Sequence, residues 1–529
     1  MRNVQERKMK PMKKLLCILL IFTLLFGITA SAEETETPPE MPSGQMAPPD
    51  SEDGTPPTPP DGSMTPPDGE NGTPPTPPDG SMTPPDGGNG EPPAKPDGNG
   101  TPPDGNPPQG GNGGFGGGTP LGGGTSSFEY AASTEITEAA ETADQAYASD
   151  TADVSALIVN TSDAVTLDNP TVTKTGDSNG GDNCNFYGLN AGVLVMGGSV
   201  TTITGGTVET SASGANGVFS YGGNGGRNGA EGDGTTVIIS DTTITTTGDG
   251  SGGIMTTGGG ITYASNLNVT TSGRSSAAIR TDRGGGTVVA DGGTYTTNGL
   301  GSPAIYSTAD ITVKNATLVS NLSEGVCIEG KNSITLENCD LTANNTQCNG
   351  NATFHDTIMI YQSMSGDADS GTSAFTMTGG SLTSLSGHMF HVTNTHAVIT
   401  LSGVNLVNEG SDVLLSVCDD GWNGASNIAE LVADGQVLSG TLLVGSNSTL
   451  TLTLQNGSSF TGSVSGEIEN AKGTAVSTEA GTVNVILDST STWTLTADTA
   501  ITSFEGDAGS VITNGYTLTV NGTVLEGTN

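Results

Sequence analysis

Basic residues are scarce in this sequence. It contains 15 Lys and Arg against 56 Asp and Glu, which gives a formal net charge of −41 at pH 7. Nucleic acids and anionic lipid surfaces are bound through clustered Lys and Arg, so the composition argues against both as partners. It also argues against electrostatic capture of polyanionic polymers such as pectate, unless bound cations mediate the contact.

Cysteine and histidine are also few. Beyond Cys17, the cysteines are an odd number of widely spaced residues: Cys184, Cys327, Cys339, Cys348 and Cys418. A small disulfide-stapled domain would be far denser in cysteine, so we expect either one disulfide, between Cys339 and Cys348, or five free thiols. His388 and His391 are three positions apart and would point to opposite faces of a strand, so a zinc site is not expected.

A long apolar run occurs at the N-terminal end. The run from Leu15 to Ile28 follows a basic start and precedes Ala30-Ser31-Ala32, a small-residue cleavage pattern. This order is typical of an export signal, and the run is shorter than the roughly 20 residues that a membrane span needs. We therefore predict a signal peptide at residues 1–32, a secreted protein, and no transmembrane segment after signal cleavage.

The next segment, residues 33–125, has almost no large apolar side chains and consists mainly of Pro, Gly, Asp and Thr. The stretch GTPPTPPDGSMTPPDG begins at Gly54 and is repeated from Gly72. Such a composition cannot form a core, and Pro-Pro pairs favour extended polyproline II. We predict a disordered linker, either a spacer that carries the following domain through a cell wall or a linker without a dedicated role.

From residue 126 onward a period appears. An apolar residue, a variable residue and a turn residue are followed by a second apolar residue five positions after the first. The unit begins at Ile203, Ile239, Ala264, Ala290, Val313, Leu336, Met377 and Leu401. Five of the seven spacings lie between 23 and 26 residues, and the two longer ones contain inserts around 222–234, 344–351 and 363–371. A period near 24 residues indicates a solenoid.

Alternating β-branched residues favour strands over helices in this solenoid, although residues 134–147 carry a weak helical pattern. Inward side chains such as Ile279, Ile305 and Ile328 would stack about 4.8 Å apart, and Asn, Gly and Asp would form the corners. We predict an all-β fold, a parallel β-helix of about 14 rungs. Residues 126–410 would form the regular part, and residues 411–529 would form irregular rungs and a cap.

The period, the turn chemistry and the closing stretch STWTLTADTAITSF resemble right-handed parallel β-helix proteins of the pectin-lyase-like superfamily. The closest resemblance is to adhesin-like and carbohydrate-binding members secreted by Gram-positive bacteria. It covers about residues 126–529 and implies the fold, which carries lyases, hydrolases, epimerases, adhesins and tailspikes. Enzyme motifs of that superfamily are poorly matched: Gly387-His388 is followed by Met389 rather than Gly, and no Arg-Ile-Lys occurs.

One outward-facing column of residues is a candidate ligand site. Arg280 and Asp282, two apart on a strand, would face outward together. In the predicted register, Arg280 shares its column with Met255 and with the remaining candidates: Tyr306, Glu329, Tyr361 and His391. The column would form a sugar platform, an enzymatic site with Arg280 as base, or a surface ion pair without a ligand.

Two acidic turns are candidates for structural Ca²⁺. Asp367 and Asp369 resemble the beginning of a calcium loop but lack its third acid and terminal Glu. Asp419 and Asp420, with Asn423, form another oxygen-rich turn. Each would equally serve as an ordinary turn in which Asp side chains bind nearby backbone.

Three functions fit the sequence. The first is a non-catalytic, monomeric, adhesin-like protein that binds a polysaccharide or a glycan of a host or cell surface. The second is a divergent polysaccharide lyase or hydrolase, and the third is a purely structural rod of the cell wall or matrix. The sequence has no sorting motif before Asn529, so we expect free secretion or non-covalent retention at the wall.

Overall fold

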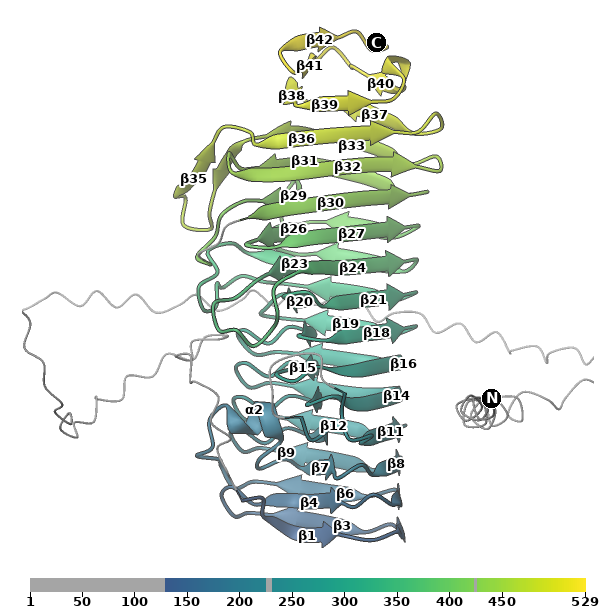
Figure 1. The fold of residues 1–529 in the computed structure, drawn as a ribbon, viewed down its shortest axis with the longest axis vertical. Helices are drawn as coiled ribbons and strands as arrows, with labels where there is room; N and C mark the ends of the chain where they lie inside the picture. The colour runs from purple at the N-terminus through teal and green to yellow at the C-terminus, as the bar shows by residue number, and fades with distance from the viewer. Residues whose placement is uncertain (1–128, 225–230, 423–425) are drawn as a thin grey trace, which may run out of the picture. The chain divides into compact units, whose positions relative to one another are not determined.

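The computed structural model describes residues 129–224, 231–422 and 426–529. The predicted signal peptide, the predicted linker at 33–125 and Asn423 of the second acidic turn lie outside these residues. The described chain is all-β: short strands stack in parallel, turn upon turn, as in a β-helix (Figure 1). Among the described residues, no helix has the length and apolar composition needed to cross a membrane.

One wall of the stack is a parallel sheet, here called sheet A, with 15 strands among the described residues. In spatial order, its strands are β1 (Ala132–Ile136), β4 (Ser155–Asn160), β7 (Val193–Met196), β10 (Val218–Tyr221), β13 (Ile254–Thr257), β15 (Ile279–Thr281), β17 (Ile305–Ser307), β20 (Val326–Glu329), β23 (Asp356–Tyr361), β26 (His388–Thr393), β29 (Val413–Val417), β31 (Val437–Val444), β33 (Ser459–Ser465), β37 (Thr492–Leu495) and β40 (Val511–Ile512).

The remaining walls belong to sheet B, which bends at a corner into two arms. The first arm contains β2 (Ala140–Ala143), β5 (Ala164–Asp168), β8 (Val200–Thr204), β11 (Thr236–Ser240), β14 (Gly260–Thr271), β16 (Gly286–Thr297), β18 (Asp310–Lys314), β21 (Ser333–Glu337), β24 (Thr372–Thr378), β27 (His396–Ser402), β30 (Asn427–Asp434), β32 (Ser448–Gln455), β36 (Thr482–Leu487) and β39 (Ser503–Glu505). The second arm contains β3 (Ala146–Ser149), β6 (Thr171–Lys174), β9 (Thr207–Thr210), β12 (Thr243–Thr246), the second halves of β14 and β16, β19 (Thr317–Ser320), β22 (Asp340–Ala343), β25 (Ser381–Ser384) and β28 (Asn405–Asn408).

The corner between the two arms is made by residues in the left-handed region. Asp241, Asn266, Asn315 and Asn338 have φ of 53°, 50°, 51° and 52°. Asn and Asp tolerate this conformation better than other residues with a Cβ. The Asn266 side chain also donates a hydrogen bond to Asp241 Oδ1 of the turn below, at 2.6 Å. The prediction that Asn, Gly and Asp form the corners is therefore confirmed.

The interior of the stack is a single apolar core of columns of inward side chains. Ile279 pairs with Ile305, as predicted, but Ile305 then pairs with Val326 rather than with Ile328. The predicted register is wrong by two residues at β20. A shift of two residues keeps each side chain on the same face, so Ile328 is still fully buried.

The middle strands of sheet A are buried on both faces, unlike those of sheet B. Its strands β10, β13, β20 and β29 are buried at every residue, whereas strands of sheet B such as β11 and β18 alternate between buried and partly exposed residues. The outer face of sheet A is covered by a short helix, α2 (Asn183–Tyr187), and by segments 344–355, 362–371 and 418–422. Phe354 from the first segment stacks on His391 at 4.6 Å, and Trp422 from the last contacts Tyr361 at 4.8 Å between ring centroids.

Smaller elements complete the C-terminal part. An antiparallel pair joins β34 (Glu467–Glu469) to β35 (Ala475–Thr478), and β38 (Thr499–Ile501) is followed in its own sheet by β41 (Leu518–Val520) and β42 (Thr523–Leu525). A 3₁₀ helix, η1 (Ala508–Ser510), lies between β38 and β41 in sequence. The weak helical pattern at 134–147 does not correspond to a helix, because these residues form β1 and β2 and begin β3.

Candidate functional site

The candidate column around Arg280 has a different register from the one predicted. Arg280 pairs with Met255 on one side and Tyr306 on the other, as expected. Beyond Tyr306, however, the column continues through Cys327 and Met359 to His391. Glu329 and Tyr361 pair with each other in the adjacent column, two residues farther along their strands. All six predicted side chains still lie on the outer face of sheet A.

That outer face is covered, so the candidate residues form no open platform. Their exposed fractions are 7% for Arg280, 3% for Asp282, 5% for Tyr306, 1% for Glu329, 2% for Tyr361 and 0% for His391. The structure thus corrects both the register and the accessibility that the sequence suggested. A ligand-binding role for these residues stays a prediction, and a polymer outside the fold would not reach them in this conformation.

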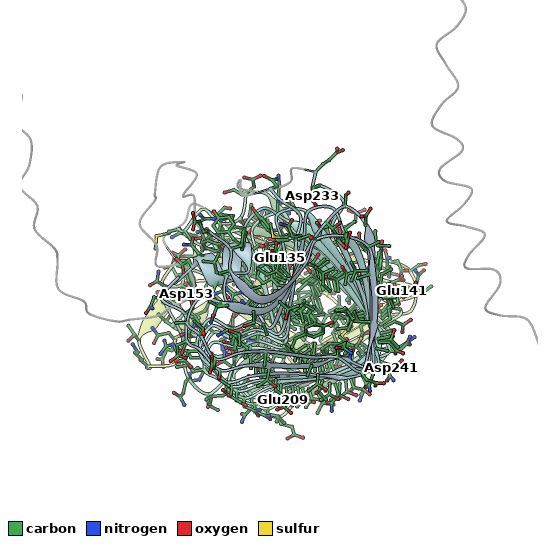
Figure 2. The ribbon with its side chains drawn as sticks, turned by 90° about the horizontal axis from the view of Figure 1, so that it is seen from below. Glu135, Glu141, Asp153, Glu209, Asp233 and Asp241 are labelled. Carbon is green, nitrogen blue, oxygen red and sulfur yellow. The ribbon has the colours of Figure 1, made fainter. Side chains whose placement is uncertain are left out.

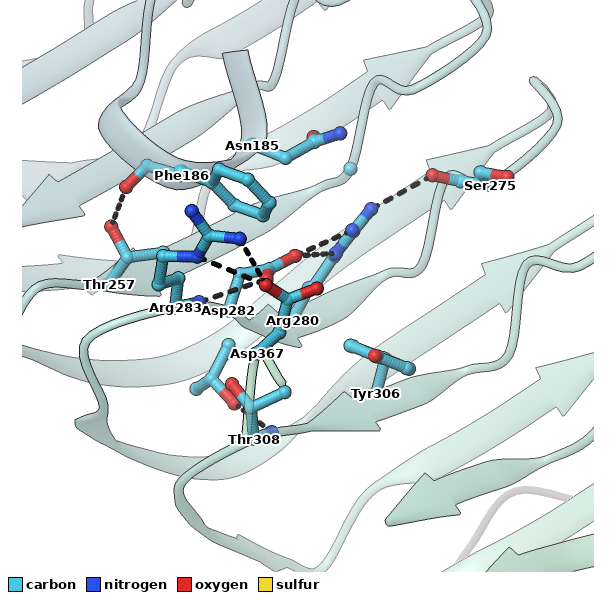
Figure 3. Close-up of polar contacts among 12 residues, drawn as sticks. Asn185, Phe186, Thr257, Ser275, Arg280, Asp282, Arg283, Tyr306, Thr308 and Asp367 are labelled. Carbon is cyan, nitrogen blue, oxygen red and sulfur yellow. Dashed lines mark hydrogen bonds and ion pairs between the residues drawn. The ribbon is translucent and has the colours of Figure 1, made fainter. Parts of the chain in front are cut away.

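Two neighbouring arginines lie on the outer face of sheet A, and one of them, Arg283, anchors the covering elements. Arg280 Nη2 lies 2.6 Å from Asp282 Oδ2, and Arg280 Nη1 donates to the Ser275 carbonyl at 3.1 Å. Arg283 forms an ion pair with Asp367 of segment 362–371, and its guanidinium lies 4.1 Å from the ring centroid of Phe186 on α2 (Figure 3). Because each charge has a partner, the pairs offset the large cost of burying charge.

Glu329 is the centre of a second buried network. It accepts hydrogen bonds from the hydroxyls of Tyr306 and Ser363, and a third, at 3.2 Å, from Tyr361. Burial raises the pKa of Glu329, and it raises the pKa values of Tyr306 and Tyr361 as well, with Glu329 adding to both. Each of these groups is therefore held closer to its neutral form than it would be in water.

The third buried site is the carboxyl of Asp356 and its acidic neighbours. Burial raises the pKa of Asp356 far above its usual range, and repulsion from Glu324 and Asp420 adds to the shift. Neither carboxylate oxygen of Asp356 has a hydrogen-bond partner among the described residues. Asp420, by contrast, lies 3.4 Å from Nε2 of His391; burial opposes ionisation, but contacts with His391 and Thr353 lower its pKa overall. Strongly shifted carboxyls are typical of active sites, yet Asp356 is 1% exposed.

The predicted calcium residues have separate partners. Asp367 pairs with Arg283, and Asp369 with Lys331 at 2.8 Å. Asp419 accepts a hydrogen bond from Asn427 at 2.7 Å. No group of three or more His, Cys, Asp or Glu side chains among the described residues is arranged to hold a metal ion. A cofactor role for these carboxylates stays a prediction that depends on other ligands.

The outer surface of sheet B is open, and its second arm carries two parallel rows of mostly polar side chains. We call these rows the hydroxyl face. The first row is Thr171, Thr207, Thr243, Asn268, Thr294, Thr317, Asp340, Ser381 and Asn405. The second row is Thr173, Glu209, Thr245, Thr270, Thr296, Val319, Thr342, Thr383 and Val407. Residues of both rows are exposed or half-buried.

The first arm has its own outer face on the other side of the corner. Seen along the stack, Glu209 lies on the hydroxyl face and Glu141 on the first arm, with Asp241 at the corner between them (Figure 2). Here the polar pattern is interrupted by an apolar group that we call the Tyr263 patch. Its members are Val200, Ile238, Ile261, Tyr263 and Val289. Ile238, Tyr263 and Val289 are neighbours in one column of adjacent strands.

Neither open face was predicted as a site from the sequence. A signal was present, because Thr-x-Thr and similar polar pairs recur in the second half of most turns, as in Thr243–Thr245 and Thr294–Thr296. Three strands of sheet A, β4, β7 and β29, in contrast read as nearly continuous apolar runs, the pattern of strands buried on both faces. Comparison of the chain with known protein families, curated proteins and solved structures finds no match, so geometry alone carries the functional argument.

Proposed function

We propose that this protein is a secreted, non-catalytic binding protein that attaches to a polysaccharide or another extended surface polymer through the outer surface of sheet B. The observation that carries the proposal is the first row of the hydroxyl face, in which nine successive strands each present a Thr, Ser, Asn or Asp. Stacked strands lie about 4.8 Å apart, so the row repeats the same hydrogen-bonding groups at a short, even interval.

Such a row suits a repeating ligand rather than a small molecule. Small-molecule sites are concave and enclose most of the ligand, whereas the hydroxyl face follows the open side of a sheet. Each hydroxyl contributes little on its own, because it exchanges a hydrogen bond with water for one with the ligand. A polymer lying across many turns would add these small contributions along its length.

The non-catalytic half of the proposal rests on burial. The carboxyls whose pKa values are raised, Asp282, Glu324, Glu329 and Asp356, are at most 3% exposed. A general acid must come within hydrogen-bond reach of the atom that it protonates. Covered by segments 344–355 and 362–371, these groups are out of reach of a polymer that lies outside the fold.

The origin and finer classification of the fold belong to the same proposal. The stacked parallel strands, and the corner Asn residues with positive φ, support a right-handed β-helix of the pectin-lyase-like type, in its adhesin-like or carbohydrate-binding form. The apolar run at Leu15–Ile28 supports export, and the acidic composition supports a partner other than nucleic acid.

The test is retention of the purified chain on insoluble cellulose, chitin and isolated Gram-positive cell walls, with the supernatants assayed for reducing and unsaturated sugar ends. We expect retention on at least one of these without new ends. New ends would make the protein an enzyme, and no retention on any polymer would leave the structural-rod alternative.

A charge placed on the hydroxyl face locates the contact. Thr270→Arg puts a long side chain in the middle of the second row and is expected to weaken retention several-fold. Thr523→Arg adds the same charge on exposed strand β42, which is not part of the hydroxyl face, and serves as the matched control. Equal retention of the two variants would show that the polymer binds elsewhere.

A further inference from the structure

The Tyr263 patch is an unusual feature of an otherwise polar surface. Tyr263 is 47% exposed, Val200 44% and Ile238 40%, whereas Ile261 and Val289 are half-buried beside them. Ile238 and Val289 flank Tyr263 on the adjacent strands β11 and β16. The result is an apolar strip, one aromatic ring at its centre, that crosses neighbouring strands of an open sheet.

Polar side chains border this strip along the strands. Ser240, Ser265 and Asp291 follow Ile238, Tyr263 and Val289 two residues later on the same outward face. Thr236 and Thr287 precede Ile238 and Val289 by two residues. A ligand lying on the strip would thus meet an apolar centre and hydrogen-bonding groups on both edges.

We propose that the Tyr263 patch is a stacking site for an uncharged polysaccharide. A pyranose ring has an apolar face of C–H groups and a rim of hydroxyls, which matches a Tyr ring and aliphatic neighbours bordered by Ser, Thr and Asp. The inference rests on the proposed function, to which it adds the class of polymer and the residues that contact it.

Charge argues for a neutral ligand. The chain carries a formal net charge of −41; Asp291 lies two residues after Val289 on β16, and Asp310 lies on the adjacent strand β18. Lys314, the nearby cation on β18, is 2.9 Å from Glu337 and so is already paired. An acidic polymer such as a polyuronate would be repelled at this surface unless cations bridged the two.

Size argues against a protein partner. A specific protein interface buries about 1,200–2,000 Å² in total, with an apolar centre larger than one aromatic ring. The patch offers three well-exposed apolar side chains, and two copies of this acidic chain would repel one another. The patch matches the footprint of one or two sugar rings instead.

The experiment measures binding of soluble cellohexaose, chitohexaose and hexagalacturonate to the full chain by titration calorimetry. We expect the wild type to bind a neutral oligosaccharide in preference to hexagalacturonate. Tyr263→Ala should weaken that binding roughly tenfold, and Tyr263→Phe, which keeps the ring, should bind nearly as the wild type does. Tyr516→Ala is the control, because Tyr516 is similarly exposed, at 41%, but lies near the C-terminal end.

Each outcome has a distinct meaning. If the wild type is retained on polymers but Tyr263→Ala binds oligosaccharides equally well, the proposed function stands and the patch assignment is wrong. If only hexagalacturonate binds, the neutral-ligand argument is overturned. If Tyr263→Ala instead converts a dimer to a monomer by light scattering, the patch is an interface between copies. Absence of binding in both this assay and the retention assay overturns the proposed function and the inference together.

Discussion

The hydroxyl of Tyr306 donates a hydrogen bond to the carboxylate of Glu329, although the two residues do not face each other in the sheet. Cys327 is the direct partner of Tyr306, and Glu329 lies two residues farther along β20. The long phenol side chain bridges this diagonal beneath segment 362–371, where Ser363 also donates to Glu329. Together, the two hydrogen bonds to Glu329 link two turns of sheet A to one of the segments that cover it.

Removal of the Tyr306 hydroxyl should destabilise the fold. Tyr306→Phe keeps the ring but leaves Glu329 with fewer donors in a site where both residues are at most 5% exposed. Loss of one partner of a buried polar group costs about 1–3 kcal/mol. We expect a decrease of that size in the unfolding free energy measured in urea, and almost none for Tyr263→Phe on the open surface. Equal stability of the two variants would contradict a structural role for this hydrogen bond.

Asp356 should make stability depend on pH. Burial first, and then Glu324, raise its pKa well above the ordinary 3.8. The neutral carboxyl contributes stability that is fully present below pH 3.8 and is lost as pH rises through the raised pKa, because the unfolded chain releases its proton earlier. Between the two pKa values, the unfolding free energy should fall by about 1.4 kcal/mol for each rise of one in pH.

Asp356→Asn removes this titration. The difference in melting temperature between the variant and the wild type should therefore move in favour of the variant as pH rises from about 4 to about 8. Titrating groups that do not interact with Asp356 cancel in that difference, whereas Glu324 and Asp420, whose charges repel its carboxylate, contribute to it. Asp163→Asn, at an exposed carboxyl, is the control for a general change in net charge. A difference that does not change with pH would show that Asp356 ionises normally.

The repeating part of the fold was predictable because it depends on local rules. Each turn must place apolar side chains inward at alternate positions and must bend at a residue that tolerates positive φ, and Asn266 and Asn315 satisfy the second requirement visibly. The inserts at 344–351 and 363–371 were also visible as breaks in the period.

The site was less predictable because it depends on where the inserts fold. Periodicity shows that Arg280 points away from the core, but only the structure shows that this residue is buried and that nearby Arg283 contacts Asp367 and Phe186 of the covering elements. The register at β20 was missed for a related reason: a shift of two residues preserves the inward and outward pattern, so the alternation cannot distinguish Cys327 from Glu329 as the partner of Tyr306.

Close stacking of glycines should make one turn intolerant of alanine. A Cβ on Gly273 would lie 1.8 Å from the carbonyl oxygen of Gly248 in the turn below, and a Cβ on Gly299 would lie 1.8 Å from that of Gly273. Backbone atoms cannot move aside without separating the turns. Gly273→Ala should therefore lower the unfolding free energy by about 1–3 kcal/mol or more. Gly509→Ala, where the nearest atom belongs to the flexible Asp507 side chain, should have a much smaller effect, and similar losses in both would contradict the argument.

The described cysteines should remain reduced and largely unreactive. All five are free thiols, and Cys184, Cys327, Cys339 and Cys418 are at most 2% exposed. Burial raises the pKa of each, which disfavours the thiolate that reacts with alkylating reagents. Cys348 is only partly buried, so it should be labelled first in the native protein, and the other four only after unfolding. Peptide mapping of iodoacetamide-labelled protein checks this order. A linked Cys339–Cys348 peptide would contradict this prediction and support the disulfide alternative.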